Sequence, residues 1–180
     1  MQPIRIQLPI TPDIARTLHA GDNVLLDGEM LVFRDAGHKR LYESILAGKP
    51  AFDIRGETVY FMGPCPAKEG EVIGSAGPTT SCRMDKYTPM LMDMGLAAQI
   101  GKGQRDAATL QAICRNNAVY FAAMGGCGAW YQHCIQQAQV VTFDDLGTEA
   151  VRRIRVKDFP VVVAADCHGG CISPSAQEQA

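Results

Sequence analysis

Three hydroxyl side chains and an arginine lie close together in the segment GSAGPTTSCRMD, residues 74–85. A glycine-proline turn precedes Thr79, Thr80 and Ser81, which would open a helix. The first amides of a helix lack partners within the helix and attract anions. Arg83, within the first turn, could hold a carboxylate through two parallel hydrogen bonds. The segment therefore predicts an anion site, although a plain helix cap beside a surface arginine would explain the same residues.

A second concentration of positive charge occurs in FRDAGHKR, residues 33–40. Arg34 and three further basic side chains lie at the expected start of a helix. Asp35 is placed to cap that helix, and His38 could titrate near neutral pH. A solvated basic helix face is the alternative interpretation.

A third cation is Lys102, which stands between two glycines in IGKG, residues 100–103. Ligands of open α/β sheets bind at loops that leave the carboxyl ends of parallel strands, and glycines allow the backbone to approach a ligand closely. A lysine in an ordinary turn is the alternative. Three loops that offer Arg34, Arg83 and Lys102 would together make a pocket for a dianion.

The elements that must position these residues alternate between strand and helix in the second half of the chain. Apolar residues repeat with helical spacing in some stretches and form short β-type runs in others. We expect an antiparallel hairpin with its corner at Asp27 and Gly28. The alternation itself predicts a parallel or mixed sheet covered by helices. The predicted strands are 4–10, 23–33, 57–63, 71–77, 96–101, 118–124, 139–143, 151–159 and 160–166, and the predicted helices are 35–46, 81–94, 104–116 and 125–137.

Composition and charge exclude several classes of function. A chain of 180 residues with 47% hydrophobic and 20% charged side chains can bury one core. We therefore expect a single domain over residues 1–172 and a disordered polar tail over 173–180. A net charge of -2 and a pI near 6.1 give no general attraction to nucleic acid or to an anionic membrane.

The sequence also favours a reducing compartment. It does not open with a basic stretch followed by an apolar run, and no later apolar run reaches membrane-spanning length, which indicates a cytoplasmic location. The 7 cysteines are an odd number and suggest reduced thiols. Cys167 and Cys171 flank His168, but a metal site usually needs a second ligand pair, so we expect no metal on this chain.

The segments RDAGHKRL, GPTTSCRMD and IGKG, in this order, strongly resemble the C-terminal half of class I fumarases and the beta subunit of L(+)-tartrate dehydratase. The likeness continues through AVYFAAMGGCGA, QVVTFDDLGTEAV and KDFPVVVAAD, and so covers nearly the whole chain. It implies an α/β fold of the swivelling β/β/α type, with a mixed sheet and flanking helices. It also implies a partner, a separate chain or an N-terminal half, that holds a [4Fe-4S] cluster through three cysteines.

The resemblance implies a role for each matching residue. Arg34 and Arg83 would bind substrate carboxylates, and Lys102 would hold another carboxylate or the developing aci-carboxylate. Thr79 and Thr80 would line the reacting carbon. The family counterpart of Thr79 is the proposed proton carrier, a role in which a threonine hydroxyl needs activation by nearby cations or backbone.

Supporting roles follow for Asp35 and His38, which would orient Arg34, and for Ser81. The chain would then be the beta subunit of an iron-sulfur hydro-lyase, in a heterodimer or heterotetramer with a cluster-bearing alpha subunit, or a homodimer when isolated. Fumarate and malate are the first expected substrate pair, and tartrate and oxaloacetate the second. The alternative is a stand-alone anion-binding or assembly module. The sequence departs from the family at Cys82, where a glycine is expected, and in its CHGGC ending.

Overall fold

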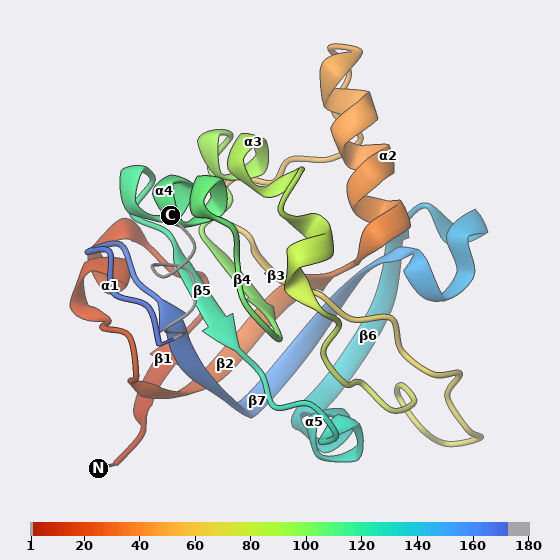
Figure 1. Cartoon of the computed structure of the whole chain (residues 1–180). Helices are drawn as coiled ribbons and strands as arrows, with labels where there is room; N and C mark the ends of the chain where they lie inside the picture. The colour runs from red at the N-terminus through yellow and green to blue at the C-terminus, as the bar shows by residue number, and fades with distance from the viewer. Residues whose placement is uncertain (1, 173–180) are drawn as a thin grey trace.

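The computed structural model describes residues 2–172, in which helices and strands alternate around one sheet (Figure 1). The predicted disordered tail, residues 173–180, lies outside the described residues. In chain order the elements are β1 (Ile4–Gln7), α1 (Pro12–Thr17), β2 (Asn23–Val32), α2 (Asp35–Leu46), β3 (Thr58–Tyr60), η1 (Ser81–Met84), α3 (Thr88–Asp93), β4 (Ala98–Gly101), α4 (Ala107–Arg115), β5 (Val119–Ala122), α5 (Gly128–Cys134), β6 (Ile135–Thr142), η2 (Asp144–Glu149) and β7 (Val151–Ala165).

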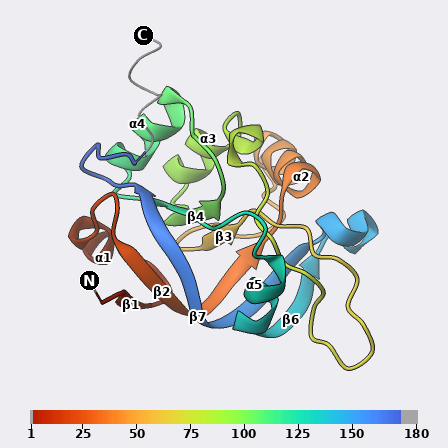
Figure 2. The same ribbon diagram turned by 60° about the horizontal axis from the view of Figure 1, so that its bottom comes forward.

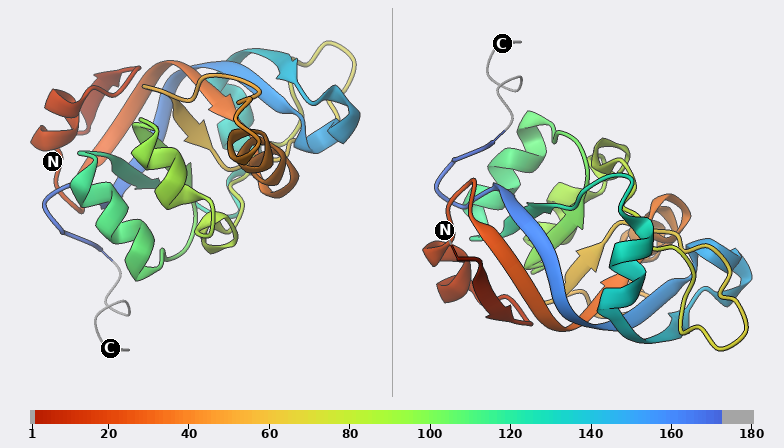
Figure 3. Two further views of the ribbon diagram at one scale, coloured as in Figure 1. Left: turned by 90° about the horizontal axis from the view of Figure 1, so that it is seen from above. Right: turned by 90° about the horizontal axis from the view of Figure 1, so that it is seen from below.

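The strands form a mixed sheet in the order β1-β2-β3-β4-β5-β7-β6. β1 to β5 pair with one another in parallel, whereas β7 runs antiparallel to β5, β6 and β2. Because β7 pairs with both β2 and β5, these strands and those between them close into a ring, in which β7 crosses beside β2 (Figure 3). The predicted α/β class, with a mixed sheet and flanking helices, is confirmed.

Alternate residues of β3 and its extension face two different hydrophobic cores. Tyr60 and Met62 lie in a core that also contains residues from α1 and α5. Val59 and Phe61 lie in a second core with residues from α2, η1, α3 and α4. This alternation is the two-residue period of a strand that is buried on both faces. Figure 2 shows α2, α3 and α4 along one side of the strands and α5 on the other.

The hairpin predicted at Asp27 and Gly28 is wrong. β2 runs through this dipeptide without turning, and β1 pairs with β2 in parallel, with α1 between them. The register of β2 against β7 shifts between Leu26 and Gly28, and Gly28 has a φ of +123°. A β-carbon at Gly28 would lie 2.8 Å from Nε2 of Gln7. The glycine therefore serves a β-bulge and the close approach of β1.

The helix predicted over residues 81–94 is two shorter elements, η1 and α3. Pro89 lies in the first turn of α3, where a proline is tolerated because its missing N–H needs no partner there. The strand predicted over residues 71–77 does not form. That stretch belongs to a loop closed by the amide of Cys65, which donates to the carbonyl of Ser75 at 3.1 Å.

The C-terminal half follows the predicted alternation with shifted boundaries. β6 begins at Ile135, inside the helix predicted over residues 125–137. The strands predicted over 151–159 and 160–166 are one strand, β7, which bends where Asp158 has a φ of +53°. Between residues 2 and 172, no helix has the length and apolar character needed to cross a membrane.

Candidate functional site

The predicted site residues follow the carboxyl ends of neighbouring parallel strands. Arg34 lies two residues after β2, and Lys102 directly follows β4. Thr79 returns the chain to the sheet between β3 and β4: its amide donates to the carbonyl of Phe61 at 2.7 Å, and its carbonyl accepts from the amide of Lys102 at 3.2 Å. The amide of Ser81 donates to the carbonyl of Lys102 at 2.8 Å. The hydroxyl segment and the lysine loop therefore form one short parallel ladder at the sheet edge.

The long helix predicted to present its first amides to an anion does not form, and anion binding at this segment stays a prediction. The amides of Thr79 and Ser81 are already used in the ladder, and η1 is a 3-10 turn of only 4 residues. A turn this short has little of the dipole that a long helix presents at its first residues. Thr79 is 8% exposed, whereas Thr80 is exposed. What the segment offers is hydroxyl side chains on a fixed backbone.

The guanidinium of Arg34 is held between Gly63 and Glu149. Its Nε lies 3.2 Å from Oε1 of Glu149, an ion-pair contact in which Nε makes no hydrogen bond to any described residue. The other carboxylate oxygen of Glu149 accepts from the amide of Ala36 at 2.7 Å, at the first turn of α2. A β-carbon at Gly63 would lie 2.6 Å from Nε of Arg34. A side chain at position 63 would therefore displace the arginine.

Asp35 does not cap α2 as predicted. It is the first residue of the helix, and its Oδ2 accepts a hydrogen bond from Nη2 of Arg83 at 2.9 Å. The pair is half exposed, with 50% of the Arg83 side chain and 41% of the Asp35 side chain accessible. Arg83 is thus bound to the segment that carries Arg34, because its partner Asp35 is the next residue after Arg34 in the chain. The start of α2 therefore lies beside η1, as Figure 1 shows.

His38 does not titrate near neutral pH, contrary to the prediction. Its ring is fully buried, with Phe33 at 4.3 Å and Phe61 at 5.1 Å between ring centroids. Burial, which penalises the charged form, lowers the pKa of His38 to about 3. Its Nδ1 lies 3.0 Å from the carbonyl oxygen of Arg34, which can only accept, so Nδ1 bears the proton. His38 is therefore a neutral side chain that supports the backbone of Arg34 through this hydrogen bond.

The other basic residues of segment 33–40 face away from this edge. Lys39 lies 3.8 Å from Glu43 on the exposed surface of α2. Arg40 donates to Asp145 at 2.6 Å and lies over the ring of Phe143. For these two residues the solvated helix face is the correct interpretation.

Lys102 is exposed and lies over the glycines that follow β5. A β-carbon at Gly125 would lie 3.7 Å from Cδ of Lys102 and 4.0 Å from its Nζ. The side chain therefore extends across the end of the neighbouring strand. The described contacts place Arg34, Arg83 and Lys102 on segments that touch along one edge. That their charged groups share a single hollow rimmed by Thr79 and Thr80 stays a prediction.

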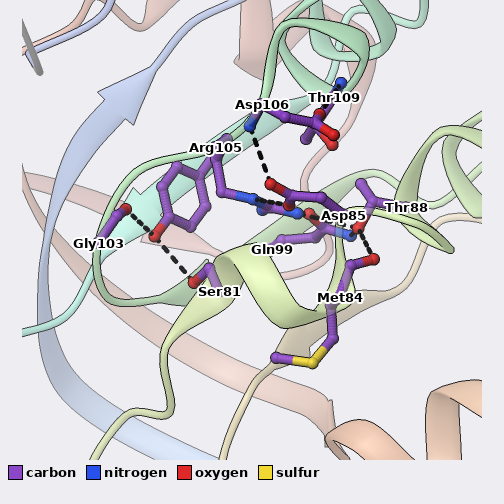
Figure 4. A network of polar contacts seen from close by, with 10 residues as sticks. Ser81, Met84, Asp85, Thr88, Gln99, Gly103, Arg105, Asp106 and Thr109 are labelled. Carbon is purple, nitrogen blue, oxygen red and sulfur yellow. Dashed lines mark hydrogen bonds and ion pairs between the residues drawn. The ribbon is translucent and has the colours of Figure 1, made fainter. Parts of the chain in front are cut away.

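A buried polar network beneath this edge was not predicted from the sequence (Figure 4). Arg105, at 5% exposure, donates to Asp85 at 2.6 Å through Nε and to Gln99 at 2.6 Å through Nη1. Its Nη2 donates to the hydroxyl of Thr88 at 2.9 Å. The hydroxyl of Tyr120 donates to the carbonyl of Gly103 and lies 2.9 Å from Oγ of Ser81, so the predicted supporting residue Ser81 contacts the network through Tyr120.

The departures noted in the sequence lie outside these contacts. Cys82 is exposed, so its side chain does not pack behind Arg83. In the CHGGC segment, Sγ of Cys167 lies 3.8 Å from Nε2 of His168, and Cys171 is exposed. Among residues 2–172, no three His, Cys, Asp or Glu side chains gather into a group that could hold a metal ion.

The family model of the fumarase C-terminus matches residues 1–173. The chain belongs to this fumarase C-terminal family. The match covers the whole sheet edge described above, from Arg34 to the strand that follows Lys102.

Curated relatives of this fumarase C-terminal chain fall into two lengths. The anaerobic class I fumarate hydratase of Escherichia coli is 35% identical over 148 residues, which cover 80% of this chain and 27% of the relative. A provisionally named class I fumarate hydratase of Geobacillus stearothermophilus is 36% identical over 94% of this chain and 33% of its own length. A provisionally named L(+)-tartrate dehydratase subunit beta of Methanocaldococcus jannaschii is 34% identical over 91% of this chain and 87% of its own length. The chain thus spans between about a quarter and a third of the length of these fumarate hydratases.

Within this family domain, the residues that sequence reasoning missed are Glu149, Asp85 and Arg105. Glu149 lies in a stretch that the sequence marks only as an acidic loop. Asp85 and Arg105 lie within the first five residues of the predicted helices 81–94 and 104–116, and their opposite charges were the one signal that the sequence offered. Their pairing depends on tertiary packing, which local patterns do not contain.

Proposed function

We propose that this chain is the beta subunit of a hydro-lyase that interconverts a hydroxy-dicarboxylate and its dehydrated product. The observation that supports this most is the ladder that joins Thr79 and Ser81 to Lys102, with Arg34 and Arg83 on the adjoining segments. The family match adds support, because curated relatives are named fumarate hydratases and a tartrate dehydratase subunit. The name of the beta-subunit relative, which is matched over 87% of its length, supports a separate partner subunit.

In the proposed complex, Arg34 and Arg83 bind the two carboxylates of the substrate. Each guanidinium already lies against a carboxylate of the chain, Arg34 against Glu149 and Arg83 against Asp35. These contacts use one edge of each guanidinium and leave further donors for a substrate, since arginine has five N–H groups in a planar fork. Half exposure of Arg83 keeps it accessible from the solvent side.

Lys102 stabilises the charge that develops during proton removal. Taking a proton from carbon beside a carboxylate moves negative charge onto that carboxylate, and a fixed ammonium group stabilises this transition state more than mobile water does. The hydroxyl of Thr79 would move the proton, with Thr80 beside it. A threonine is a poor base in water, so this role requires the neighbouring cations to stabilise its deprotonated form.

The resemblance implies a [4Fe-4S] cluster held by the partner subunit. When bound, such a cluster supplies a Lewis acid for the hydroxyl group that leaves or arrives. The proposal assigns no cluster ligand to this chain. The residues described here bind the carboxylates, move the proton and fix the position of the substrate. Fumarate with malate is the first proposed substrate pair, and tartrate with oxaloacetate is the second.

The test is reconstitution of the complete enzyme. The chain is co-expressed with a cluster-bearing alpha subunit, the cluster is rebuilt without oxygen, and fumarate hydration and tartrate dehydration are followed by absorbance. We expect a heterodimer or heterotetramer that turns over one of these substrates, with neither chain active alone. A homo-oligomer that binds dicarboxylates but neither associates with the alpha subunit nor turns over substrate would instead support a stand-alone anion-binding module.

A further inference from the structure

Arg105 forms a buried ion pair directly beneath the proposed carboxylate site. Its side chain is 1% exposed and that of Asp85 is 5% exposed, and Nε of Arg105 donates to Oδ1 of Asp85 at 2.6 Å. The guanidinium lies over the rings of Tyr120 at 4.7 Å and Phe61 at 5.4 Å from its central carbon. All three nitrogen atoms of the guanidinium have an acceptor.

The pair joins elements that lie on both sides of the site ladder. Asp85 follows η1, whereas Arg105 precedes α4. The second carboxylate oxygen of Asp85 accepts from the amide of Asp106 at 2.8 Å, where α4 begins. Nη1 of Arg105 bonds Gln99 on β4, and Nη2 bonds Thr88 on α3 (Figure 4). A single ion pair thus connects α3, α4 and β4.

Tyr120 extends the network to the ladder itself. Its hydroxyl lies 2.9 Å from Oγ of Ser81 and 2.8 Å from the carbonyl oxygen of Gly103, so it links the two segments that flank Lys102. The aromatic ring of Tyr120 lies against the guanidinium of Arg105. A shift of Arg105 would therefore move the hydroxyl that fixes Ser81 and Gly103.

Stability alone gives little reason for this arrangement. Burying two charges costs free energy that their attraction only partly offsets, and an apolar pair of equal volume is often as stable or more stable. Burial raises the pKa of Asp85 despite the adjacent Arg105, which is the expected sign of that cost. An apolar pair could not provide directional hydrogen bonds to α3, α4 and β4 at once.

We propose that Arg105 and Asp85 are positioning residues that hold the Thr79–Arg83 segment and the Lys102 loop in one fixed geometry. This inference rests on the proposed function, because it assigns the network to the same site. The network keeps the distance between the hydroxyl groups of the Thr79–Arg83 segment and the ammonium group of Lys102 constant, so that a bound substrate contacts both. A displacement of about 1 Å in such a site costs on the order of 100-fold in rate.

The first test is amide hydrogen exchange in the full chain without a partner, measured by NMR at Ser81 and Lys102. These amides donate across the ladder, to Lys102 and Thr79 respectively. For Arg105→Lys we expect their protection to fall at least about tenfold more than that of amides in β1 and β2, because losing hydrogen bonds to a charged group eases local opening at the ladder. The control is Val163→Ala, a cavity in the other core, which should lower protection evenly. An even loss in Arg105→Lys, or none, would overturn the proposal.

The second readout is the kinetics of the reconstituted complex. Arg105→Lys should lower kcat/KM on the order of 100-fold, chiefly in kcat, while Val163→Ala at matched stability stays within about threefold of the wild type. Tyr120→Phe, which removes only the bridging hydroxyl, is the milder variant if Arg105→Lys does not fold, and it should loosen Ser81 and Gly103 alone. If the complex turns over neither substrate, the proposed function fails, whereas the exchange result decides the positioning role independently.

Discussion

The carboxylate of Glu149 lies 3.2 Å from Nε of Arg34 and accepts from the amide of Ala36 at 2.7 Å. One side chain from η2 thus caps α2 and fixes the arginine that precedes the helix. Arg152 secures this loop in turn, since its guanidinium donates to the carbonyls of Gly147, Thr148 and Ala150. The position of Arg34 is therefore set by a segment more than a hundred residues away in the chain.

Glu149→Ala should remove the helix cap and release Arg34 together. We expect a loss of about 1 kcal/mol in the free energy of unfolding, because replacing a capping acceptor typically costs that much. Glu149→Gln keeps an oxygen for the amide of Ala36 and should lose less. Urea unfolding followed by circular dichroism measures both. Equal stability of the two variants and the wild type would show that the contact at Ala36 does not stabilise α2.

Asp35→Asn should separate the structural and functional roles of Arg83. The ion pair between these residues is half exposed, so its loss should change the free energy of unfolding by less than about 1 kcal/mol. Arg83→Ala should be equally stable, yet raise KM for the dicarboxylate roughly 10- to 100-fold in the reconstituted complex. Steady-state kinetics decides the point. A normal KM in Arg83→Ala would remove Arg83 from the substrate site.

His38 should make the fold less stable in acid. Its pKa is about 3 in the folded chain and near 6.5 when exposed, so the unfolded chain binds the proton first as the pH falls. The stability contributed by neutral His38 is complete above about pH 6.5 and declines between pH 6.5 and pH 3. At pH 4.5 the loss should be roughly 2–3 kcal/mol relative to pH 7.

The matched control is His38→Phe, which fills the same aromatic cluster but cannot bind a proton. Between pH 7 and pH 4.5, the free energy of unfolding of His38→Phe should fall by roughly 2–3 kcal/mol less than that of the wild type. Titration of denaturant midpoints at both pH values gives the difference. Parallel losses in the two proteins would mean that His38 is protonated in the folded chain.

Gly63→Ala should disable the site without unfolding the chain. The new methyl group would lie 2.6 Å from Nε of Arg34, so the flexible guanidinium must move away. We expect kcat/KM to fall on the order of 10- to 100-fold at a nearly unchanged melting temperature. Gly77→Ala is the control, since its methyl group would meet Cα of Gly128 at an ordinary 3.5 Å, and neither glycine has a positive φ. Identical kinetics in both variants would contradict the placement of Arg34 over Gly63.

Local patterns predicted the elements well where one signal dominated. α2 begins and ends where its apolar spacing and the following Gly48 and Pro50 predict. The hairpin failed because Asp27-Gly28 suits both a tight turn and a bulge, and only the partner strand decides between them. That partner, β7, comes more than a hundred residues later.

The site residues also divide into those that local patterns predict and those that depend on tertiary packing. The sequence placed Lys102 after the carboxyl end of a parallel strand, where the structure has it, directly after β4. It did not place Arg34 there, because the hairpin expected at Asp27 and Gly28 hid the parallel direction of β2. It missed the burial of His38, although the residue lies three positions before the buried Leu41 and therefore on the same face of α2. The acids that hold Arg34 and Arg105 could not be predicted, since their pairing depends on which loops the folded sheet brings together.

The most direct test of the proposed function is turnover by the reconstituted complex with Lys102→Ala in this chain. Because Lys102 lies beside Thr79 and Ser81 in the ladder, its loss should lower kcat roughly 100- to 1000-fold on fumarate or tartrate. Association of the subunits, measured by gel filtration, should not change. Lys157→Ala, on β7, is the matched charge control and should keep full activity. Full turnover in Lys102→Ala would contradict the assignment of this sheet edge as the substrate site.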